Sequence, residues 1–213
     1  MINKKYLVLI ITILFLVMNF SISVQAVDTA VTIVPQKQFV KAVAGDDSEV
    51  TVMIPPGYSP GNYAPRPSEL TKFSNAKIYF SMGVPADVQN ILPKVEQFNS
   101  EIKVVKLAEL VGQKYEDRTF ENGSRDPHIW LSPKRVKYII EIIRDELSKL
   151  DPDNEELYHD NAEEYIEKIN ETDQRVQEII NQKDNNYMLV YHPSFGYFAE
   201  HYGLNMISIE KGG

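Results

Sequence analysis

The apolar and polar positions of this chain are most regular between Asn154 and Gln182, a run of 29 residues without glycine or proline. Apolar residues recur there at three- and four-residue intervals, as in a helix with one buried stripe, and glutamate and lysine fill most of the other positions. As one helix the run would be roughly 43 Å long, which exceeds the width of a small domain. We therefore predict a backbone helix, within residues 151–183, that links two lobes. Thr172 and Asp173 interrupt the apolar stripe, which disfavours a coiled-coil stalk.

Before that helix, short β-branched runs alternate with short helical stretches, which is typical of an α/β lobe with a mostly parallel sheet. Ser132 and Pro133 then fit the N-cap and the first position of an amphipathic helix. Residues 27–150 are therefore predicted to form an N-terminal α/β lobe. Its strands are predicted at 31–34, 49–54, 77–82 and 102–107, and its first helices at 35–44, 69–74 and 86–97.

Residues 184–213 are predicted to begin a second α/β lobe. They contain strand patterns at 187–191 and 205–209 and a short helix at 194–202. Two strands and one helix cannot close a lobe around a core of its own. The predicted fold class is thus α/β, with two α/β lobes joined by a long rigid backbone helix. We expect the second lobe to be incomplete and the chain to be truncated at its C-terminal end.

The first 26 residues have the pattern of an export signal. Lys4 and Lys5 precede the apolar run 6–23, and Val24-Gln25-Ala26 resembles a small-residue cleavage site. We predict a secretory signal peptide over residues 1–26. The alternative is an uncleaved membrane anchor, because the apolar run is nearly long enough to span a bilayer. Both alternatives place the rest of the chain in the periplasm or outside the cell.

Composition narrows the chemistry. The net charge is −8, and the chain has no basic run, which makes nucleic acid a poor candidate partner. There is no cysteine, so disulfides, thiolate metal sites and cysteine nucleophiles are excluded. Hydrophobic residues make up 43% and charged residues 24%, an ordinary globular composition.

Two histidines occupy matching local positions. His128 lies just before the helix that begins at Pro133, and His192 ends a predicted strand and precedes another helix. A helix N-terminus disfavours imidazolium, and neutral imidazole is the form that a divalent metal requires. One histidine from each lobe would place a metal between the lobes; alternatively, each ring only packs or caps a turn. His159 and His201 are predicted to be surface residues.

Three segments carry a family resemblance. Residues 126–133 resemble the D-P-H-x-W-L-x-P signature of the zinc- and manganese-binding solute-binding proteins of ABC transporters, residues 191–198 resemble the H-x-x-F-x-Y-F segment of that family, and residues 54–67 resemble its P-P-G loop. The resemblance implies a monomeric, non-enzymatic protein that carries zinc or manganese as cargo between two lobes and delivers it to a membrane permease. It also implies that His128 and His192 are metal ligands.

The sequence departs from this family in the first-lobe loop. Gly61 stands where the family has a ligating histidine, and Ala64 stands where the loop has a glutamate. The family's fourth ligand, a carboxylate, would follow Gly213. Two imidazoles rarely hold zinc tightly, so the identity of the metal stays open. Asn62 or Tyr63 could supply an oxygen instead.

Two other interpretations remain open. A secreted zinc hydrolase would need a carboxylate and an open water position beside the two histidines, but there is no H-E-x-x-H and Asp126 is the only carboxylate near them in sequence. A degenerate family member without tight metal binding, serving as a scaffold or in cell adhesion, would account for Gly61 and for an incomplete second lobe.

Overall fold

The computed structural model describes residue 5 and residues 27–210, apart from the side chain of Glu96. The predicted signal peptide, residues 1–26, lies outside the described residues except for Lys5. In the part of the chain that the structure describes, no helix is long and apolar enough to cross a membrane.

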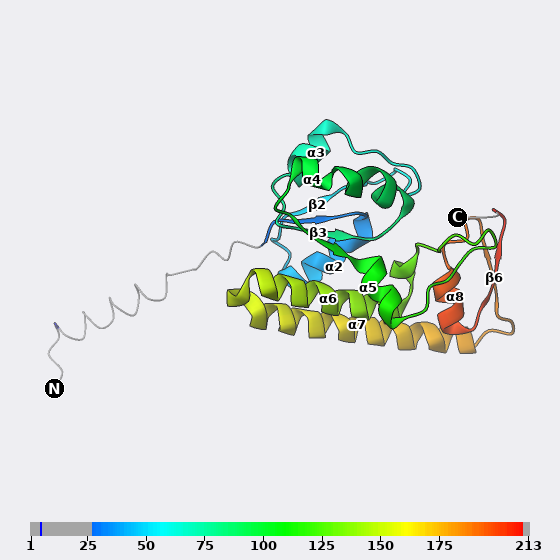
Figure 1. The fold of residues 1–213 in the computed structure, drawn as a ribbon. Coiled ribbons are helices and arrows are strands. Elements are labelled where there is room, and N and C mark those ends of the chain that lie inside the picture. Colours follow the sequence, from blue (N-terminus) through cyan, green and yellow to red (C-terminus); the bar gives the residue numbers. More distant parts are fainter. Residues whose placement is uncertain (1–4, 6–26, 211–213) are drawn as a thin grey trace.

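The N-terminal half is built on a four-stranded sheet in the order β2-β1-β3-β4, in which every pairing is parallel. Helices lie on both faces of this sheet (Figure 1). Because both faces are covered, every residue of β1 and β3 is buried. The strands are β1 Thr29–Val31, β2 Val50–Val52, β3 Ile78–Ser81 and β4 Lys103–Lys106, and the helices are α2 Val34–Ala44, α3 Pro67–Phe73, α4 Val95–Phe98 and α5 Leu107–Lys114.

Two predicted boundaries in this half are wrong for local reasons. The strand predicted at 31–34 ends at Val31, because the side-chain oxygen of Gln36 accepts the backbone N–H groups of Thr32 and Ile33 at 3.0 Å each. The helix predicted at 86–97 is divided into a π-helical turn, Asp87–Ile91, a 3-10 turn, Leu92–Lys94, and α4. Pro93 lacks the N–H that a continuous helix would need there.

Two long helices support the sheet from one side (Figure 1). α6, Pro133–Leu150, buries an apolar stripe that includes Ile139, Ile143 and Leu147. α7, Glu155–Asn181, has 27 residues and is therefore about 40 Å long. Its N-terminal part packs against α2 and α6, and its C-terminal part continues beyond the sheet toward the second half.

The second half is small in the described residues. β5, Tyr187–Val190, pairs in parallel with β6, Asn205–Ser208, and α8, Gly196–Tyr202, connects them and packs against β6. The predicted fold class, an α/β architecture assembled on a long helix, is confirmed. The exact division at residues 150/151 and 183/184 stays a prediction.

Candidate metal centre

His128 is held by the residue two positions before it. Its Nδ1 lies 2.8 Å from Oδ1 of Asp126, and the same oxygen accepts the backbone N–H of His128 at 3.0 Å. An aspartate side chain that accepts the N–H two residues on forms a local turn, so Asp-Pro-His is suited to this geometry. Asp126 is buried, and therefore the ring has a fixed orientation with Nε2 left free of this carboxylate.

His192 is held by a residue from the neighbouring strand. Its Nδ1 lies 2.8 Å from Oε2 of Glu210. In the parallel register Val190 is opposite Ser208, so the residues two positions further on, His192 and Glu210, emerge side by side at the carboxyl edge of the sheet. Asp126 is the only carboxylate near the two histidines in sequence, but Glu210 lies beside His192 in the structure. The register between β5 and β6 is the signal that could have identified Glu210.

The structure brings the two predicted histidines together. The ring centroids of His128 and His192 are 5.3 Å apart, with an interplanar angle of 75°. His128 is the more enclosed of the two, with 12% of its side chain exposed against 43% for His192. Trp130 lies 5.1 Å from the His128 ring and Phe120 lies 6.4 Å from it, centroid to centroid. The pair is thus apolar on the His128 side and open to solvent on the His192 side.

The first-lobe loop contributes little that could bind an ion. Gly61 and Asn62 are exposed, whereas the hydroxyl of Tyr63 donates to both carboxylate oxygens of Glu69, at 2.6 and 2.8 Å. Burial, and then the adjacent Glu69, raise the pKa of Tyr63 to about 12, so this hydroxyl stays protonated. Within residues 27–210, no group of three histidine, aspartate or glutamate side chains is placed to hold a metal ion.

The other two histidines differ from each other. The side chain of His159 is 42% exposed on α7, in keeping with the predicted surface position. His201 is less exposed than predicted, with 20% of its side chain exposed, because its Nε2 lies 2.8 Å from Oδ1 of Asp173 on α7. Tyr202 donates to the same oxygen at 2.8 Å. His201 therefore helps to fasten α8 to the long helix.

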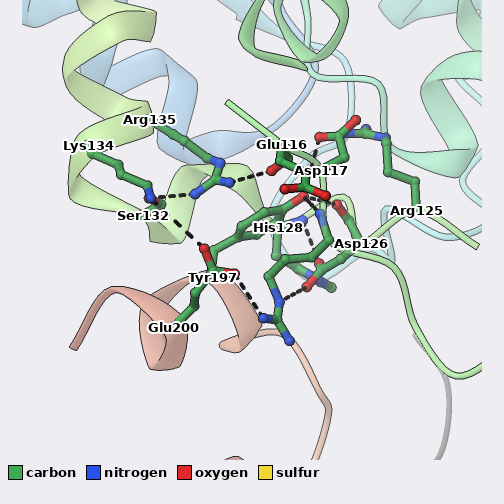
Figure 2. A network of polar contacts seen from close by, with 11 residues as sticks. Glu116, Asp117, Arg125, Asp126, His128, Ser132, Lys134, Arg135, Tyr197 and Glu200 are labelled. Atoms are coloured by element: carbon green, nitrogen blue, oxygen red, sulfur yellow. Dashed lines mark hydrogen bonds and ion pairs between the residues drawn. The ribbon is translucent and has the colours of Figure 1, made fainter. Parts of the chain in front are cut away.

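A polar network lies behind His128 (Figure 2). It joins the segment 116–126 to Tyr197 and Glu200 of α8 and to Arg135 of α6. The guanidinium of Arg135 is buried and lies 4.2 Å from the centroid of the Tyr197 ring. The segment that positions His128 is thus in direct contact with the helix that follows His192.

Residues 30–212 match the protein family described as ZnuA, zinc-uptake complex component A, periplasmic. The chain belongs to the ZnuA family. The family resemblance predicted from the three sequence segments is confirmed. The family description names a component of a zinc-uptake complex.

Relatives of the ZnuA family differ in the ion for which they are named. The zinc-binding lipoprotein AdcA of Streptococcus pneumoniae strain R6 is 31% identical over 190 residues, which are 84% of this chain and 38% of AdcA. The manganese-binding lipoprotein MntA of Halalkalibacterium halodurans is 28% identical over 169 residues, 78% of this chain and 55% of MntA. This chain thus spans from about two fifths to just over half of the length of these curated relatives.

A crystal structure of ZnuA agrees with the fold described above. It superposes with a TM-score of 0.79 at 34% sequence identity, covering 87% of this chain and 71% of the ZnuA chain.

Proposed function

We propose that this chain is the extracytoplasmic ion-binding component of an ABC importer for zinc or manganese, and that it holds the ion between His128 and His192. Two imidazoles that converge, each with its Nδ1 on a carboxylate, are the observation that supports this most directly. Metal-binding histidines usually donate one ring N–H to a carboxylate or carbonyl, which fixes the tautomer and leaves the other nitrogen for the ion.

The separation of the rings also suits one shared ion. Metal–nitrogen bonds to zinc are about 2.0–2.1 Å long, so two imidazoles on one tetrahedral ion would have ring centroids roughly 5 Å apart. The observed centroid distance is 5.3 Å. The ring separation is therefore compatible with one shared ion, and the remaining coordination positions would be taken by water or by ligands outside the described residues.

The choice of ion follows from the ligands that complete the site. Imidazole nitrogen suits zinc, whereas additional carboxylate oxygens would favour manganese. Glu210 is the carboxylate beside His192, and it accepts from Nδ1 of that ring, so it acts here as a support for the imidazole. The two supported imidazoles alone therefore favour zinc over manganese.

The test is a competition titration of the exported chain with zinc and with manganese. His128→Ala and His192→Ala should each weaken zinc binding by more than about 100-fold, since removing a ligand costs more than removing its support. His159→Ala is the matched control, because it removes an exposed imidazole from the same chain, and it should bind as the wild type does. If both His128→Ala and His192→Ala bind zinc as tightly as the wild type does, the ion is bound elsewhere.

One alternative has an observation in its favour. Gly61 stands where the family resemblance implies a loop histidine, and within the described part of the chain no group of three histidine, aspartate or glutamate side chains is placed to hold an ion. A scaffold or adhesion role without tight metal binding would fit this. A wild-type melting temperature that no divalent ion raises at millimolar concentration would support that role over ion transport.

A further inference from the structure

The segment 118–126 is a short antiparallel hairpin with an interrupted base. Thr119 and Arg125 face each other in an antiparallel bridge, and the N–H of Asp126 donates to the carbonyl of Arg118 at 2.8 Å. In a regular antiparallel ladder Arg118 and Asp126 would exchange two hydrogen bonds, so the N–H of Arg118 would also donate to the carbonyl of Asp126. Here a side-chain hydroxyl from another part of the chain stands between these two groups.

That hydroxyl belongs to Tyr197 of α8. It accepts the N–H of Arg118 at 2.9 Å and donates to the carbonyl of Asp126 at 3.1 Å, and so it replaces the missing bond with a longer bridge. The Tyr197 side chain is fully buried beneath the guanidinium of Arg135. Burial raises the pKa of Tyr197 to about 12, so the hydroxyl keeps the proton that it donates.

Asp126 transmits this contact to the ion site. Its backbone carbonyl is held by Tyr197, and its side chain holds both the ring and the backbone N–H of His128. The residue before Tyr197 lies equally close to the hairpin: a Cβ on Gly196 would be 2.8 Å from Oδ2 of Asp126 and 2.7 Å from Nε of Arg118. α8 therefore fits against this carboxylate without room for a side chain.

His192 lies only four residues before Gly196 on the same connection. The start of α8 thus belongs to the segment that contains His192. Tyr197 of the same helix contacts the hairpin 118–126, which directly precedes His128. We propose that Tyr197 is a positioning residue for the ion: its hydroxyl spaces the base of hairpin 118–126 and so sets where His128 lies relative to His192. This inference rests on the proposed function, because it concerns affinity at that histidine pair.

The experiment compares Tyr197→Phe with Tyr202→Phe. Both substitutions remove a hydroxyl from a buried tyrosine of α8, but the Tyr202 hydroxyl donates to Asp173 on α7 rather than to the hairpin. Zinc affinity is measured by competition titration, the absorption spectrum of the cobalt(II) complex reports the coordination geometry, and urea unfolding of the metal-free protein reports stability.

We expect Tyr197→Phe to weaken zinc binding by about tenfold or more, in line with losses seen when residues that orient a ligand are removed. Its cobalt(II) spectrum should change as well. Tyr202→Phe should destabilise the metal-free protein to a similar degree, yet leave the zinc affinity and the cobalt(II) spectrum as in the wild type.

Wild-type zinc affinity and an unchanged spectrum in Tyr197→Phe would overturn this inference and leave the proposed function intact. A wild-type protein that binds no zinc would overturn both. If Tyr197→Phe does not fold, Gly196→Ala is the second variant, because it keeps the hydroxyl but pushes on the same carboxylate of Asp126. Gly196→Ala should then show the loss of zinc affinity, and unchanged affinity in this variant would overturn the inference that the contact of α8 with the hairpin at Asp126 sets the position of His128.

Discussion

The two halves of this molecule bury their sheets very differently. In the N-terminal half, β1 and β3 are covered on both faces. In the C-terminal half, alternate residues of β5 and β6 are exposed, and Leu189 reaches 70%. The first half therefore has a closed core of its own, whereas α8 of the second half is joined to α7 through Asp173 and to the segment 116–126 through Tyr197 and Glu200.

The two histidines lie on opposite sides of this difference. The Nδ1 of His128 contacts a buried carboxylate, Asp126. The Nδ1 of His192 contacts an exposed carboxylate, Glu210, at the edge of the small sheet. A site assembled across such a boundary should be rigid on one side and adjustable on the other. The following substitutions test how far the halves differ.

The largest effect is expected at Asp87 in the first half. This fully buried carboxylate accepts hydrogen bonds from the hydroxyls of Thr32, Tyr79 and Ser81 and from the N–H of Gly83, at 2.6–3.0 Å. Asp87→Ala leaves these buried donors without an acceptor and should lower the free energy of unfolding by about 3–5 kcal/mol in urea denaturation. Asp47→Ala, at an exposed position, is the control. A loss of less than about 1 kcal/mol at Asp87 would refute the rigid core.

A smaller and local effect is expected at Asp173. It accepts from His201 and Tyr202 of α8, and so Asp173→Ala should free α8 from α7 at a cost of about 2 kcal/mol. The measurement is amide hydrogen exchange: exchange should speed up in β5 and β6 and stay unchanged in β1 and β3. Uniform acceleration in both sheets would mean that the halves unfold together.

The contact between Asp173 and α8 should depend on pH. Burial alone would raise the pKa of Asp173, but hydrogen bonds from His201 and Tyr202 outweigh it and hold the pKa below the usual 3.8. A carboxyl group with a lowered pKa stabilises the fold above its unfolded-state pKa, and that contribution is lost as the pH falls through the folded-state pKa. The exchange difference between wild type and Asp173→Ala should therefore be full at neutral pH and shrink below about pH 4.

The smallest effect is expected on the open face of the second sheet. Leu189→Ala should change the free energy of unfolding by less than about 0.5 kcal/mol, because 70% of Leu189 is already exposed. Ile78→Ala in β3 is the matched substitution, and it should cost about 2–5 kcal/mol because Ile78 is fully buried. Similar losses in thermal or urea unfolding would show that Leu189 is covered in solution.

Local patterns predicted much of this architecture. The spacing of Tyr158, Ala162 and Tyr165 identified α7 within one residue at either end, since a helix depends on contacts three and four positions apart. Pattern alone misplaced the end of β1, because Gln36 closes that strand from the following helix. It also missed the role of His201, whose partner lies on another helix.

What the sequence by itself determined is therefore the helix-linked α/β fold and the local setting of each of the two histidines, because periodicity and the Asp-Pro-His turn act over a few residues. Only the tertiary structure decided that the rings of His128 and His192 converge, that Glu210 supports one of them, and that Tyr197 stands between Arg118 and Asp126. These contacts depend on strand register and on how α8 packs against a hairpin about 70–80 residues earlier, which no local pattern in the chain expresses.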